Sequence, residues 1–86
     1  MNIKVFDGNL QSNQEVTIGI DQSLTGFALS AVSIEHPSEH LTWVYKSPYK
    51  GVQRLADIRG WMTTKFDELW LRNNQIKDIA MEGTVL

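Results

Sequence analysis

The chain has 86 residues, which is enough for one small domain and too few for two. It has no cysteine, which excludes a disulfide framework and a thiolate metal site, and its net charge of -2 argues against coating nucleic acid by charge alone. No apolar run approaches the roughly 20 residues that span a bilayer, and the first four residues lack the apolar core of a signal peptide. We therefore expect a soluble intracellular protein.

The first 14 residues are polar and rich in Asn and Gln, with a brief alternation of Ile3 and Val5 and a turn signal at Asp7-Gly8. We predict that residues 1–14 form an N-terminal arm of uncertain structure. The more regular pattern that begins after it assigns residues 15–86 to a single domain.

Three strands are predicted next. Residues 16–21 (VTIGID) form a β-branched run that is typical of a buried central strand. Residues 26–35 place apolar side chains on both faces, and the short link before them, residues 22–25, predicts an antiparallel hairpin. A turn at residues 36–39, which include Pro37, leads into the aromatic and branched strand 41–45. The result is a three-stranded antiparallel meander.

The apolar period then changes to steps of three and four, which predicts a helix over residues 52–70 that ends near Asn73-Asn74. Ser47 before Pro48 is the predicted start signal. One apolar stripe is expected to face the sheet: Leu55, Ile58, Met62, Phe66 and Leu69. Residues 76–82 return to a strand, which the right-handed crossover rule makes parallel to its neighbour. The predicted fold class is therefore α/β, with a meander, a long helix and a parallel fourth strand.

Two predicted strands end in an acid, Asp21 and Glu82. If those strands are adjacent and parallel, both carboxylates project at one edge of the sheet, near enough to share one or two divalent ions. Oxygen ligands select Mg²⁺ or Mn²⁺ over zinc, and such ions support phosphodiester cleavage. Acids at strand ends also occur by chance, so the pattern alone does not establish a metal site.

The residues around these acids resemble a known family. Residues 18–28 (IGIDQSLTGFA) closely resemble the first motif of RuvC-type Holliday junction resolvases, especially bacteriophage forms. Residues 54–59 (RLADIR) look like the start of that family's first long helix, and residues 78–83 (DIAMEG) look like its fourth-strand motif. The resemblance spans residues 16–86.

The resemblance implies an RNase H-like fold, of which this chain is the N-terminal half, and a Mg²⁺-dependent or Mn²⁺-dependent homodimer. It also implies paired nicks at four-way DNA junctions in the cytoplasm of a bacterial host. Asp21 and Glu82 carry over as catalytic, metal-binding acids, and Gly19 and Gly26 as structural glycines for close packing and a turn. The family has two further acids on a late helix, to which nothing here corresponds, and Gln22 stands where such motifs often have Pro. We therefore expect the chain to need a second segment or polypeptide for activity.

Four of the eight cationic residues lie in one short stretch and are candidates for contacts to the DNA backbone: Lys46, Lys50, Arg54 and Arg59. An ordinary solvated helix start explains them equally well. Three acids on the predicted helix lie where the family keeps no catalytic acid and are expected on the solvated surface: Asp57, Asp67 and Glu68.

The remaining candidates have simpler explanations. His36 and His40 have a spacing that could hold a metal on a helix, but the intervening proline favours a turn. Ser23 and Thr25 lack a histidine partner and are read as turn hydroxyls. Three tryptophans are expected in the core or an interface rather than stacked on bases: Trp43, Trp61 and Trp70.

Two rival functions stay open. A similar strand motif occurs in the actin-like ATPase and sugar kinase group, although the Glu82-Gly83 strand end favours the resolvase. The other rival is a truncated, non-catalytic binding or assembly module. One predicted helix covers only one face of strands that are apolar on both, so we expect an exposed face that binds a second segment.

Overall fold

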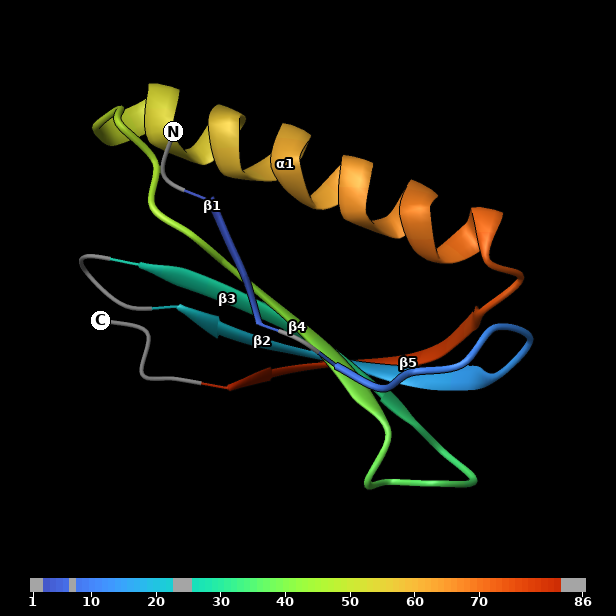
Figure 1. Cartoon of the computed structure of the whole chain (residues 1–86). Helices are drawn as coiled ribbons and strands as arrows, with labels where there is room; N and C mark the ends of the chain where they lie inside the picture. Colours follow the sequence, from blue (N-terminus) through green and yellow to red (C-terminus); the bar gives the residue numbers. More distant parts are fainter. Residues whose placement is uncertain (1–2, 7, 23–25, 83–86) are drawn as a thin grey trace.

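The computed structural model describes residues 3–6, 8–22 and 26–82 as a mixed sheet with one long helix across one face (Figure 1). The five strands are β1 (Ile3–Phe6), β2 (Glu15–Gln22), β3 (Phe27–Ser33), β4 (His40–Tyr45) and β5 (Gln75–Glu82). The helix α1 spans Gly51–Leu71. The spatial order of the strands is β1-β4-β3-β2-β5.

The predicted α/β arrangement is confirmed at this level. Strands β2, β3 and β4 form the antiparallel meander, and α1 returns the chain so that β5 lies parallel to β2. The hairpin between β2 and β3 closes on the pair Gln22 and Phe27, while its link, residues 23–25, lies outside the described residues. The predicted turn before β4 is closed by a 2.8 Å hydrogen bond from the Glu39 amide to the His36 carbonyl.

The N-terminal arm contains a strand that the sequence did not predict. Strand β1 pairs antiparallel with β4, from Ile3 opposite Tyr45 to Phe6 opposite Thr42, and so makes the sheet five-stranded rather than four-stranded. Its four residues are too few to give a clear period, and the free backbone groups at the edge of β4 supply the pairing.

Residues 8–14 lead into β2 and pass the C-terminal end of α1. The Asn13 amide donates to the carbonyl of Arg72 at 3.1 Å, and the Gln14 amide donates to the side chain of Asn74 at 2.9 Å. Leu10 is buried in the core. At Gly8 the backbone passes so close to β4 that a Cβ would lie 1.9 Å from the His40 carbonyl oxygen, so only glycine fits there.

The start of the helix differs from the prediction, whereas its end agrees. Helix α1 begins at Gly51, whose φ of +62° favours glycine, and Lys50 rather than Ser47 precedes it without a side-chain cap. At the other end Asn73 has a φ of +62°, which asparagine tolerates better than most residues. The amides of Asn73 and Asn74 return to the carbonyls of Trp70 and Leu69, which forms a Schellman ending.

The core lies between α1 and the helix side of the three central strands. Trp61 packs in a T-shaped contact on Phe27 and stacks on Tyr45 with ring centroids 5.1 Å apart. The packing of Trp61 rotates α1 away from the orientation that the predicted stripe implies, so Leu55 is 60% exposed instead of buried. The core contributions of the other stripe residues are confirmed, with Ile58 and Leu69 buried and Met62 and Phe66 packed beside them.

Only one face of the sheet is covered within the described residues. Val16, Ile18 and Ile20 of β2 are buried under α1, while Thr17, Gly19 and Asp21 alternate onto the other face. No helix formed by the described residues is long and apolar enough to cross a membrane.

Candidate metal and nucleic-acid site

Asp21 and Glu82 occupy register positions directly opposite each other. They are partners in the parallel pairing of β2 with β5, at the C-terminal ends of both strands. Neighbouring strands lie about 4.8 Å apart, so the two backbones are near enough for two carboxylates to reach one ion. Asp21 is exposed on the face away from α1.

A one-residue shift in the pairing produces this match. Val16 pairs with Ile76, but Thr17 pairs with Asp78, so Lys77 is the additional residue on β5. Without the shift, Asp21 would lie opposite Met81 instead of Glu82. The sequence gives no signal for the shift, because Lys77 has no special turn or bulge chemistry.

The two glycines of the motif do not have equal roles. At Gly19 an added Cβ would meet no atom within 4 Å, so the close packing expected from the resemblance is absent within the described structure. Gly19 lies instead on the uncovered face beside Asp21, where it leaves room for a neighbouring layer. Gly26 directly precedes β3 at the hairpin, consistent with a turn.

Several cationic residues gather at the same end of the sheet. The register places Gln22, Phe27 and Tyr45 side by side across β2, β3 and β4, so β4 leads into α1 at the end that carries Asp21 (Figure 1). Lys46 and Lys50 are exposed in the connection between β4 and α1. Two of the four predicted phosphate contacts, Lys46 and Lys50, therefore lie at the end that holds the predicted metal ligands.

The four predicted DNA contacts do not form one patch. Lys50 and Arg54 are four residues apart, so they lie on one side of the helix start, and the Arg54 amide donates to the Lys50 carbonyl at 3.4 Å. Arg59 is five residues beyond Arg54 and so about 140° further around the helix. It lies with Val52, Leu55 and Ala56 around a shallow hollow. The structure thus separates Arg59 from the other three.

Asp57 is not the free surface acid that the sequence suggested. Its Oδ2 accepts hydrogen bonds from the Tyr45 hydroxyl at 2.5 Å and from the Ser47 hydroxyl at 2.7 Å. These bonds, that from Ser47 first, hold the pKa of the Asp57 carboxyl below its usual value. The hydrogen bond between Tyr45 and Asp57, together with burial, raises the pKa of Tyr45 to about 12. Nothing in the sequence indicates this contact, because Asp57 is the seventh residue of a helix and Tyr45 is the last residue of a strand.

The other predicted surface acids are exposed. Glu68 forms an ion pair with Lys65 at 2.7 Å, and Asp67 is exposed near the C-terminal end of α1. Among the side chains that the structure describes, no three acidic or histidine residues converge in a cluster that could hold a metal.

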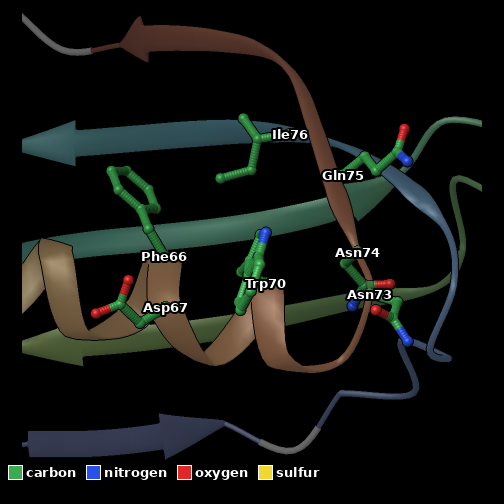
Figure 2. Close-up of a pocket in the computed structure, with 7 residues that line it drawn as sticks. All are labelled: Phe66, Asp67, Trp70, Asn73, Asn74, Gln75 and Ile76. Atoms are coloured by element: carbon green, nitrogen blue, oxygen red, sulfur yellow. The ribbon is translucent and has the colours of Figure 1, made fainter.

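The pocket in Figure 2 is remote from Asp21 and Glu82, because it lies at the opposite end of β5. It has a volume of about 500 Å³ and lies where α1 ends and β5 begins, with Phe66 and Trp70 on the side of the helix toward Ile76. The predicted site lies at the C-terminal end of β5, so none of its residues lines this pocket. Trp43 and Trp61 are buried in the core, whereas Trp70 is 74% exposed, so the expectation of a core or interface position leaves an interface as the remaining prediction for Trp70.

Several apolar side chains of β5 and α1 remain exposed. On β5, Ile79 and Met81 are 52% and 61% exposed, although their register partners on β2 are buried. Leu55 and Trp70 are exposed on α1. These residues show that α1 covers the central strands but leaves Ile79 and Met81 of β5 uncovered.

No protein-family model, curated protein or solved structure matches this chain. What the site can do must therefore follow from its own residues and their placement.

Proposed function

We propose that this chain is the N-terminal part of a Mg²⁺-dependent or Mn²⁺-dependent endonuclease with an RNase H-like fold, acting on four-way DNA junctions. The observation that supports it is the register pairing of Asp21 with Glu82 on adjacent parallel strands. A meander, a long helix and a parallel return strand form the framework on which such a pair can act.

The donor chemistry suits a hard divalent cation. Two carboxylates offer only oxygen ligands, which Mg²⁺ and Mn²⁺ prefer, and Asp21 stands exposed where an ion and a phosphate can approach. The bound ions would activate a water molecule and stabilise the leaving oxygen of the phosphodiester. Mg²⁺ requires octahedral completion, so two carboxylates hold it weakly without further ligands.

The substrate class follows from the charges at this end of the sheet. Lys46, Lys50 and Arg54 offer positive charge at the same end of the sheet as the two acids, which suits a phosphate backbone that passes this end close to a metal. The choice of a four-way junction rests on the resemblance of residues 18–28 to the resolvase motif.

We propose further that a second polypeptide segment completes the site, in an assembly that is a homodimer when complete. The exposed Ile79 and Met81 of β5 support this proposal, because exposed apolar surface normally marks an interface. A non-catalytic assembly module is the second candidate, and the same surface favours it.

The test compares variants of the two strand-end acids, Asp21 and Glu82, with a variant of a control acid that lies on β5. We expect Asp21→Asn and Glu82→Gln to reduce Mg²⁺-dependent nicking of a four-way junction by roughly 100-fold or more in the completed protein. Asp78→Asn is the control, because Asp78 is exposed on β5 but lies opposite Thr17 rather than at the strand end. Linear duplex of the same sequence tests whether the enzyme selects the branched structure.

The outcomes separate the two candidates. Nicking that survives both Asp21→Asn and Glu82→Gln contradicts the nuclease site. A complex that co-elutes with a candidate second segment and binds junctions without cutting them supports the non-catalytic module instead.

A further inference from the structure

We propose that Asp57 is a positioning residue, which acts through Tyr45 and Ser47 to hold residues 46–50 so that Lys46 and Lys50 contact the phosphates of bound DNA. For its ligand this inference rests on the proposed nuclease function. The contacts that form the clamp are independent of that function.

The clamp joins three segments of the chain through one carboxylate. Asp57 lies on α1, Tyr45 ends β4, and Ser47 lies in the connection between them, and both hydroxyls donate to the same Asp57 oxygen. The Ser47 hydroxyl oxygen also accepts the amide of Tyr49 at 3.2 Å. Each contact restrains a different part of the connection.

The backbone on either side of the connection is restrained as well. Tyr45 is held by its stack on Trp61, and Pro48 has a fixed φ. Lys50 is extended before the left-handed Gly51, and its carbonyl accepts the Arg54 amide. Lys46 and Lys50 therefore project from a backbone whose path is fixed between two anchored ends.

The chemistry of the clamp leaves these lysines available. Hydroxyl groups, rather than a cation, supply the two hydrogen bonds to Asp57. Within the described part of the chain, Lys46 and Lys50 are exposed and form no ion pair. Cations on a restrained backbone lose less conformational freedom on binding a phosphate than cations on an unrestrained loop.

The experiment measures the salt dependence of junction binding in EDTA, so that no cleavage occurs. Asp57→Ala is compared with Asp67→Ala, which removes the same charge from an exposed position on the same helix. Loss of a negative charge alone strengthens binding to DNA in both variants. If Asp57 positions two phosphate contacts, Asp57→Ala instead weakens binding and lowers the slope of log affinity against log salt by about two.

A double variant that changes no charge checks that the effect of Asp57→Ala does not come from misfolding. Tyr45→Phe with Ser47→Ala removes both donors but keeps the ring on Trp61 and the charge of Asp57. Tyr49→Phe is its control, because only the backbone amide of Tyr49 joins the clamp. The double variant should lower the salt slope like Asp57→Ala, whereas Tyr49→Phe should leave it unchanged.

The results distinguish this inference from the proposed function. If the unmodified protein binds the junction with a salt-dependent affinity but Asp57→Ala behaves like Asp67→Ala, the positioning role is overturned and the nuclease proposal survives. If the unmodified chain, in complex with the second segment that completes the site, shows no salt-dependent binding to DNA, both are overturned. A lower salt slope in Asp57→Ala and in the double variant, with both controls unchanged in slope, supports the positioning role.

Discussion

The two faces of strand β2 differ in what they do. On one face Val16, Ile18 and Ile20 are buried beneath α1, and on the other Thr17, Gly19 and Asp21 are half-buried or exposed. The covered face supplies the apolar burial that holds the sheet together, while the open face carries the acid proposed to bind a metal. Alternate residues of one strand therefore contribute to stability and to the proposed metal site. Substitutions on the covered face should change the free energy of unfolding, and substitutions on the open face should change the proposed activity or association.

The largest expected effect compares neighbouring residues on opposite faces. Ile18 is fully buried, so Ile18→Ala should reduce the free energy of unfolding by about 2–5 kcal/mol, because it removes buried carbons and leaves a cavity. Thr17→Ala should reduce it by less than about 1 kcal/mol. Urea unfolding followed by circular dichroism measures both. Equal losses would show that the open face is also covered in solution.

The second prediction concerns the Tyr45 hydroxyl on the covered face. Folding raises the Tyr45 pKa from 10.0 to about 12, so its contribution to stability is complete below pH 10 and is lost as the pH rises from 10 to 12. Because Tyr45 keeps 9% of its surface exposed, solvent screens part of the effect, which leaves a loss of about 1–2 kcal/mol. Unfolding measured across this range should show that loss in the unmodified chain and in Tyr49→Phe, but not in Tyr45→Phe. Identical pH profiles for all three would contradict a native hydrogen bond between Tyr45 and Asp57.

The smallest expected effect uses two glycines. Gly60 lies inside α1 with no atom within 4 Å of an added Cβ, so Gly60→Ala should stabilise the chain by about 0.5–1 kcal/mol. Gly19 has the same free space on the open face, so Gly19→Ala should not destabilise the chain. If another layer packs there, however, Gly19→Ala should reduce association or nicking while thermal unfolding of the chain is unchanged. Unaffected association would mean that no close neighbour approaches β2 at Gly19.

The local pattern of the sequence determined most of the secondary structure. Alternating and β-branched residues predicted three strands of the meander, and the change of period predicted the helix and its end at Asn73-Asn74. These features are local, because each depends on the spacing of apolar residues or on the backbone preference of one residue. The parallel return of β5 followed from the handedness of the crossover.

Tertiary contacts decided the rest. Strand β1 forms through pairing with the edge of β4, and Trp61 sets the rotation of α1 through its packing on Tyr45 and Phe27. The sequence placed Asp21 and Glu82 at strand ends, but the one-residue shift at Lys77 brings them opposite each other. Asp57 meets its two hydroxyl partners only because α1 lies back across β4. Each of these contacts joins residues whose relative register or rotation is set by the packing of whole elements, which local sequence preference does not specify.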